Sequence, residues 1–207
     1  MKFPTLRFIL IGMAEIQILL PHKQIYSMQE IKALGLSHYK TAKLVDEKKL
    51  AHLNKSHYEN LMFSGEPNDF YFVPAFIPSG VICLMSAAVY YNLTTYRPDS
   101  IDVAVANRKK ISTMPEAFSI KLHYFSKDKL ELGVNHIDIN GNSFVIFDIE
   151  KTVVDIICAR NKVGIDETKE ILVNYLSLPE RNINKLYRYA EKLRCLRTLK
   201  SYLEVLL

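Results

Sequence analysis

The chain lacks the short motifs that mark several large enzyme classes. No G-x-S-x-G, no Walker loop and no G-x-G-x-x-G occurs in its 207 residues, so nothing supports a serine hydrolase, an NTPase or a dinucleotide-binding enzyme. Internal repeats and low-complexity segments are absent as well. With 49% hydrophobic and 24% charged residues, the composition is that of an ordinary folded protein with one large or two small domains.

Cysteine is scarce, and Cys83, Cys158 and Cys195 lie far apart in the sequence. Each has apolar neighbours, which indicates buried thiols in a reducing cytoplasm. No Cys-x-x-Cys and no His/Cys pair has the spacing of zinc ligands. We therefore expect no metal site and no cofactor.

No apolar run is long enough to span a bilayer. The apolar beginning of the chain is interrupted by Glu15 and Gln17, and no small-x-small cleavage site follows it. We expect instead a first helix that ends near Pro21 and packs on the elements that follow. The prediction is a soluble, cytoplasmic protein with no membrane partner.

Acidic residues are few at the two ends of the chain. Residues 1–65 hold 9 Lys and Arg against 5 Asp and Glu, and residues 160–207 hold 10 against 6, whereas residues 66–159 hold 8 against 11. A basic N-terminal module suggests phosphate as its partner, because Lys and Arg contacts release counterions from nucleic acid.

The most informative stretch covers residues 27–58. Ser27 and Glu30 have the spacing of a capping box, which predicts that a helix begins directly after the serine. Gly35 can adopt the left-handed conformation that ends a helix, and Ser37 fits the N-cap of a second one. Two helices joined by a short connection that contains Gly are typical of a helix-turn-helix.

The second helix has one side that is expected to pack and one that is free to touch a partner. The packing side comprises Thr41, Leu44, Val45 and Lys48, and the other side Tyr39, Lys40, Lys43 and Asp46. After this helix, residues 50–53 and 57–59 can pair as a hairpin across Asn54-Lys55-Ser56, which predicts a wing with Lys55 at its tip.

Cap, turn, helix and wing together favour DNA binding over the alternative, a winged-helix module used for protein contacts. The start of the second helix would enter the major groove, while Lys43 and Lys55 neutralise backbone phosphates. The candidate DNA-binding residues are Ser27, Gln29, Ser37, His38, Tyr39, Lys40, Lys43, Lys55, Ser56 and His57.

Turn-forming residues cluster at 63–69, which predicts a domain boundary there. We expect an α+β protein with a winged helix-turn-helix DNA-binding domain over residues 1–64 and a mixed α/β domain with a helical tail over residues 65–207. The elements expected in the second domain are a buried helix over Val81–Leu93, strands over 101–105 and 120–125, a hairpin about Asn140-Gly141 and a helix that ends at Ala159.

Basic residues recur on one face of a predicted helix in the tail, which suggests a surface for an anion or a protein. They are Arg181, Lys185, Arg188 and Lys192. Four leucines after them share a face in another phase, so we expect a break near Arg194 and a separate last helix.

Carboxylates in the middle of the chain raise the alternative of a metal-dependent nuclease. They are Asp99, Asp102, Asp138, Asp148, Glu150 and Asp155. Their spacing does not support it, because Pro98-Asp99 lacks a following E-x-K, and Asp148 and Glu150 fit a helix N-terminus, whose dipole they complement. We expect no catalytic residue and no enzyme activity.

Several blocks, in this order, resemble the AbiEi family of antitoxins and transcriptional regulators. The blocks are residues 36–45, 50–58, 81–88, 92–94, 101–105 and 147–155. Family members carry Gly at the end of the recognition helix and Arg-Gly at the wing tip, where this chain has Lys48 and Lys55-Ser56.

The resemblance implies an N-terminal winged helix that represses its own operon by binding inverted repeats in double-stranded promoter DNA. It also implies a C-terminal domain that counteracts a nucleotidyltransferase-like toxin in a phage-defence, or abortive-infection, system without requiring a stable complex with it. The alternative is a winged-helix transcriptional regulator whose C-terminal domain senses a ligand or protein unrelated to a toxin.

Overall fold

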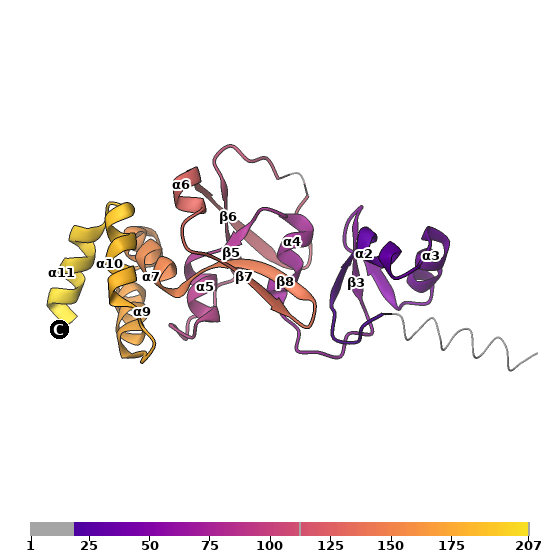
Figure 1. Cartoon of the computed structure of the whole chain (residues 1–207), viewed down its shortest axis with the longest axis horizontal. Helices are drawn as coiled ribbons and strands as arrows, with labels where there is room; N and C mark the ends of the chain where they lie inside the picture. Colours follow the sequence, from indigo (N-terminus) through magenta and orange to yellow (C-terminus); the bar gives the residue numbers. More distant parts are fainter. Residues whose placement is uncertain (1–18, 112, 207) are drawn as a thin grey trace, which may run out of the picture. The chain divides into compact units, whose positions relative to one another are not determined.

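The computed structural model describes residues 19–111 and 113–206 and shows a mixed α+β protein with two sheets (Figure 1). The chain divides into two compact units. The first comprises Met1–Pro78 with Asp138–Ser143, and the second comprises Ser79–Ile137 with Phe144–Leu207. The helix expected to end near Pro21 lies outside the described residues.

The first unit contains a three-stranded antiparallel sheet in the order β1-β3-β2. The expected hairpin is confirmed as β2 and β3, with Ala51 opposite Glu59. Strand β1 was not predicted. The elements are β1 (Ile25–Ser27), α2 (Met28–Ala33), α3 (His38–Asp46), β2 (Leu50–His52), β3 (His57–Asn60), the 3-10 helix η1 (Asp69–Phe72) and α4 (Val73–Phe76).

The predicted start and end of α2 and the predicted start of α3 are confirmed. Ser27 accepts from the Glu30 amide while the Glu30 carboxylate accepts from the Ser27 amide, which completes the capping box. Gly35 ends α2 with φ +80°, and its amide and that of Leu36 donate to carbonyls of the last turn. Ser37 caps α3 by accepting from the Lys40 amide at 3.3 Å.

A small apolar core holds these helices on the sheet. Its buried members come from both helices and all three strands, so the core explains why the short elements keep their places. They are Leu19, Tyr26, Ile31, Leu36, Leu44, Leu50 and Tyr58.

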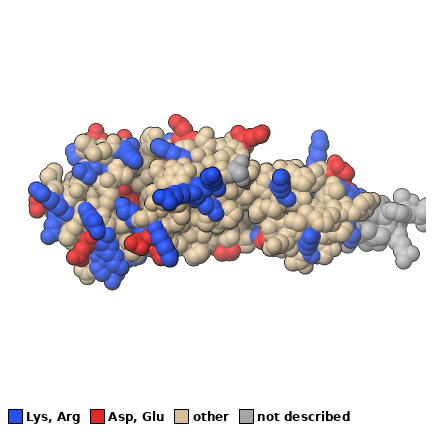
Figure 2. All heavy atoms as spheres, turned by 90° about the horizontal axis from the view of Figure 1, so that it is seen from above, with Lys and Arg blue, Asp and Glu red and all other residues tan. Residues whose placement is uncertain are grey.

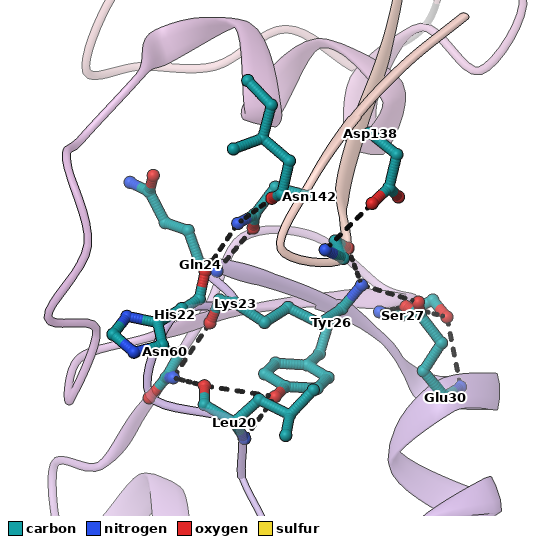
Figure 3. Close-up of polar contacts among 12 residues, drawn as sticks. Leu20, His22, Lys23, Gln24, Tyr26, Ser27, Glu30, Asn60, Asp138 and Asn142 are labelled. Atoms are coloured by element: carbon teal, nitrogen blue, oxygen red, sulfur yellow. Dashed lines mark hydrogen bonds and ion pairs between the residues drawn. The ribbon is translucent and has the colours of Figure 1, made fainter.

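The turn 138–143 belongs to the first unit and is bonded to the segment before β1 (Figure 3). Asn142 accepts from the Gln24 amide at 2.6 Å and donates to the His22 carbonyl at 2.7 Å. The Lys23 ammonium donates to the Gly141 carbonyl.

The expected boundary between residues 64 and 65 also falls inside this unit. Residues 65–78 stay with it because Asn54 donates to the Ala75 carbonyl at 2.7 Å and Tyr71 is buried.

Glu30 makes the stability of the first unit depend on pH. Burial opposes ionisation, but bonds from Ser27 and from Lys23, whose Nζ lies 2.9 Å away, outweigh it, so the pKa of Glu30 is lowered from 4.5. A lowered pKa contributes stability that is present above the unfolded value and is lost as pH falls through the folded value.

We expect Glu30→Gln, which retains a capping-box acceptor, to lose this contribution. Chemical denaturation at several pH values should show a gap in unfolding free energy between wild type and variant that is constant above pH of about 5 and shrinks below it. Glu66→Gln, in the same unit, is the control. A gap that does not change with pH would contradict the prediction.

The second unit is built on a five-stranded sheet in the order β6-β5-β4-β8-β7, whose outer strand β7 also runs into the turn 138–143. Strand β4 pairs antiparallel with β5 and parallel with β8, and β5 pairs parallel with β6. The elements are β4 (Val81–Ile82), α5 (Leu84–Tyr90), β5 (Ser100–Ala106), β6 (Ser119–Phe125), α6 (Lys127–Leu130), β7 (Val134–Ile139), β8 (Asn142–Phe147), α7 (Ile149–Cys158), α8 (Arg160–Val163), α9 (Ile165–Ser177), α10 (Ile183–Lys192) and α11 (Leu196–Leu206).

The buried helix expected over Val81–Leu93 is partly wrong. Only Leu84–Tyr90 is helical, and Val81–Ile82 forms the central strand of the sheet. A continuous apolar run fits a buried helix and a central strand equally well, so periodicity could not separate them. The predicted strands near 101–105 and 120–125, the hairpin at Asn140-Gly141 and the helix after Asp148 are confirmed.

The predicted break in the tail is confirmed at Arg194, which has φ +57° between α10 and α11. Helix α7 is at the centre of the helical part and contacts α5, α9, α10 and α11. Val153, Val154, Ile156 and Ile157 of α7 are fully buried there.

The three cysteines carry free thiols. Cys83 and Cys195 are buried and Cys158 is partly buried. The thiols of Cys158 and Cys195 form a hydrogen bond, which raises the pKa of Cys158 and lowers that of Cys195.

Within residues 19–111 and 113–206, no helix has the length and apolar character needed to cross a membrane.

Candidate nucleic-acid interface

Helix α3 has a buried face and an exposed face, as its sequence predicted for all but one residue. Thr41 and Leu44 are buried against the first unit's core, and Thr41 also donates from its hydroxyl to the Ser37 carbonyl at 2.9 Å. The exposed face begins at the N-cap and includes Tyr39, whose side chain is 81% exposed. A tyrosine this exposed contributes almost nothing to the core and is available to a partner.

Most of the residues predicted to contact DNA are exposed. Those on the helices are Gln29, Ser37, His38, Tyr39, Lys40 and Lys43, and those at the hairpin tip are Lys55 and Ser56. On the face shown in Figure 2, the Lys and Arg side chains of the first unit stand apart, with uncharged surface between them. On this face the basic side chains therefore form separate points of charge rather than one dense patch.

The hairpin tip is shaped by Asn54, whose side-chain oxygen accepts from the amides of Ser56 and His57 at 2.9 and 3.0 Å. This bonding turns the chain sharply and leaves Lys55 exposed at the tip. Asn54 also donates to the Ala75 carbonyl, so the tip is held from a second direction.

Two of the predicted contact residues are used by the fold itself. Ser27 is half-buried, and its hydroxyl bonds to the Glu30 carboxylate at 2.8 Å. His57 is also half-buried, and burial lowers its pKa, although Glu30 opposes this. A neutral, half-buried His57 adds no positive charge at neutral pH.

The prediction for Lys48, which assumed that the second helix continues to this residue, is wrong. The sequence analysis put it on the packing side of the second helix, but α3 ends at Asp46 and Lys48 is exposed with φ +55°. The Lys48 amide donates to the Val45 carbonyl at 3.0 Å and the Lys49 amide to the Leu44 carbonyl at 2.9 Å. These two bonds form a Schellman motif, in which the left-handed position is usually Gly.

We expect Lys48→Gly to raise the free energy of unfolding by about 0.5–1 kcal/mol, because Gly has no Cβ to strain the left-handed backbone. Urea denaturation followed by circular dichroism measures this change. Lys43→Gly, in the interior of the same helix, is the control and should cost about 1 kcal/mol. Destabilisation by both substitutions would contradict the prediction.

The basic face expected in the tail is interrupted in the structure. Arg188 and Lys192 on α10 are exposed, and Arg181 precedes the helix and donates to the Leu178 carbonyl at 2.8 Å. The Lys185 ammonium lies 3.1 Å from Asp148 and 3.0 Å from Glu150, both of which are buried.

These bonds explain how two carboxylates can be buried at the start of α7, Asp148 at the N-cap and Glu150 in the first turn. Asp148 caps α7 through the Lys151 amide at 2.8 Å and accepts from the Tyr189 hydroxyl at 2.9 Å. Burial and the bond to Asp148 raise the pKa of Tyr189 to about 12. The carboxylates raise the pKa of Lys185 although burial lowers it, so Lys185 acts as their counterion. The sequence placed Lys185 on the basic face of the helix but did not show that it pairs with these two carboxylates.

The remaining carboxylates do not form a metal site within the described ranges. Asp102 bonds to His123 at 2.7 Å and Asp155 bonds to Lys151. Residues 19–111 and 113–206 contain no group of three or more His, Cys, Asp or Glu side chains that could hold a metal ion.

Comparison of the chain with models of protein families found none that matches it, and a search of curated proteins found no significant similarity.

Proposed function

We propose that this chain is an antitoxin that binds double-stranded promoter DNA through its first unit and represses its own operon. In this proposal α2, α3 and the hairpin β2–β3 form a winged helix-turn-helix, with α3 as the recognition helix. The observation that supports it best is the start of α3. There Ser37, His38, Tyr39 and Lys40 are all exposed, on a helix whose other face is buried.

The exposed residues have different roles in this proposal. His38, Tyr39 and Lys40 occupy the first turn of α3, from which side chains reach base edges or phosphates in a major groove. Lys43 lies one turn later, with its Nζ 3.8 Å from Glu47, and this loose exposed pair leaves it able to meet a phosphate. Lys55 and Ser56 contact the backbone from the wing.

A gel shift with the DNA upstream of the chain's own gene tests the DNA-binding part. Saturable binding that is at least about tenfold tighter than binding to scrambled DNA of equal length is expected. Equal affinity for both DNAs would remove sequence-specific repression from the proposal. The assay needs a stated salt concentration, because phosphate contacts weaken steeply as salt rises.

The antitoxin part rests on the order of the sequence blocks alone. It predicts that co-expression of the chain protects cells from a nucleotidyltransferase toxin encoded by the adjacent gene. Arg188→Glu with Lys192→Glu should reduce protection if the exposed part of the tail's basic face contacts the toxin or its substrate. Lys185 is unsuitable for this test, because replacing it would leave Asp148 and Glu150 without their counterion.

A second candidate function is a winged-helix regulator whose second unit senses a small ligand. A polar pocket of about 490 Å³ in that unit favours it. The identity of the adjacent gene separates the two functions, since a nucleotidyltransferase gene supports the antitoxin and an unrelated operon supports the sensor.

A further inference from the structure

The pocket in the second unit lies at the sheet edge formed by β6. Its walls come from the start of α5, the segment before β5, strands β5 and β6, and the helices α8 and α9. Its volume of about 490 Å³ is within the range of small-molecule sites, which is roughly 300–1,000 Å³.

Strand register brings three polar side chains to one face of the sheet at this pocket. Asp102 on β5 is directly opposite Lys121 on β6, and His123 is two residues after Lys121. Residues two apart on a strand point to the same side, so all three share a face. All three line the pocket.

His123 is held in a defined orientation. Its Nε2 lies 2.7 Å from Asp102 Oδ1, and because a carboxylate can only accept, Nε2 carries the proton. Asp102 is buried, and its own amide donates to the Ser86 hydroxyl at 2.8 Å. In the neutral ring this bond leaves Nδ1 of His123 as an acceptor, which can meet a hydroxyl donor of a ligand.

Of the three carboxylates that line the pocket, only that of Asp102 has a bonded partner among the described residues. Asp102 is bonded to His123, and Glu167 folds back over Gly164, where a Cβ would lie 1.9 Å from its Oε2. Lys121 and Lys162 are exposed, and neither forms an ion pair with another described residue. The lining therefore offers two ammonium groups and two carboxylates, those of Asp99 and Glu167, that bond to no other described residue.

An aromatic ring completes the lining. Tyr96 is 50% exposed although it is a large side chain, and it precedes β5 in the segment that contributes Pro98 and Asp99. An exposed ring beside a pocket offers a surface on which a planar group stacks.

We propose that this pocket binds a nucleoside phosphate. Lys121 and Lys162 match the phosphate, Asp99 matches ribose hydroxyls as acidic residues do in nucleotide sites, and Tyr96 matches the base. The proposal is independent of DNA binding by the first unit, so failure of the gel shift leaves it standing.

Isothermal titration of the full chain tests the proposal with four ribonucleoside 5′-monophosphates, the matching nucleosides and inorganic phosphate. At least one monophosphate should bind with Kd below about 1 mM, and its nucleoside and inorganic phosphate should each bind at least about tenfold more weakly. Binding of no monophosphate below this limit would overturn the proposal. Equal binding of inorganic phosphate would overturn it too, because that outcome indicates a bare anion site.

Variants identify the residues that recognise each part. Lys121→Ala with Lys162→Ala should weaken the bound monophosphate about tenfold or more, with little effect on the nucleoside. Tyr96→Ala should weaken both about tenfold. Lys169→Ala, an exposed lysine on α9 outside the lining, should change neither. Wild-type affinity in the double lysine variant, with an unchanged circular dichroism spectrum in all variants, would overturn the assignment of the site.

Discussion

Lys151→Met is expected to lower the free energy of unfolding by about 3–5 kcal/mol, because it leaves a buried carboxylate without its cation. Lys151 is fully buried on α7, and its ammonium bonds to Asp155 one turn later. Its Nζ also lies 4.2 Å from the centre of the Phe147 ring and 5.1 Å from that of Phe125. Methionine has a similar length, so the loss reports the unpaired charge rather than a cavity.

The cost of this substitution should depend on pH. Burial raises the pKa of Asp155, and Lys151 opposes that rise. Without Lys151 the pKa of Asp155 rises further, so the variant's carboxyl stays protonated to a higher pH than in the wild type. The protonated carboxyl carries no charge and is therefore tolerated in the interior. The difference in free energy of unfolding between wild type and variant should thus grow as pH increases through the raised pKa values of Asp155.

Urea denaturation at pH 5 and pH 8 measures both effects. The matched control is Lys127→Met, since Lys127 also has an acidic partner four residues later, Glu131, but at 3.8 Å and with both side chains exposed. It should cost less than about 0.5 kcal/mol. Lys151→Met with Asp155→Leu should recover much of the loss, because an apolar pair replaces the ion pair. Stability of Lys151→Met within about 0.5 kcal/mol of wild type would contradict the prediction.

Lys40→Ala with Lys43→Ala is expected to weaken binding to the chain's own upstream DNA by about 10-fold to 100-fold near physiological salt. Both lysines are on the exposed face of α3. If each meets one phosphate, the slope of log K against log salt should become shallower by about two units.

Lys169→Ala with Lys200→Ala is the matched control for this measurement. It removes the same charge from exposed positions in the second unit, so it corrects for net charge alone. Equal slopes for the two double variants would place the phosphate contacts elsewhere. Tyr39→Ala should reduce discrimination between own and scrambled DNA without changing the slope, because tyrosine carries no charge at neutral pH.

Local features of both units were predictable because the atoms that decide them are close in sequence. The capping box joins Ser27 and Glu30, and the left-handed turn needs only Gly35. The hairpin of β2 and β3 depends on a short turn, and the break at Arg194 follows from a change of helical phase. In each case the deciding contact spans a few residues.

Contacts between distant segments could not be predicted in this way. Strand β1 exists because it pairs with β3 some thirty residues later, and Val81–Ile82 becomes a strand because β5 and β8 flank it. The pocket in the second unit depends equally on such contacts, since its polar groups come from the segment before β5, from β5 and β6, and from α8 and α9. The residues that line the pocket form no recognisable motif in the sequence.

By itself the sequence determined where α2 begins and ends, where α3 begins, which face of α3 is apolar and where the hairpin turns, because these depend on backbone and side-chain chemistry within one or two turns. Tertiary structure decided which of the predicted contact residues are available to a partner. It committed His57 to a half-buried position and Lys185 to two buried carboxylates, while Lys48 is left exposed beyond the end of α3. Which side chains are buried, and which groups they pair with, depends on segments that meet only after folding. For this reason the sequence alone could not predict them.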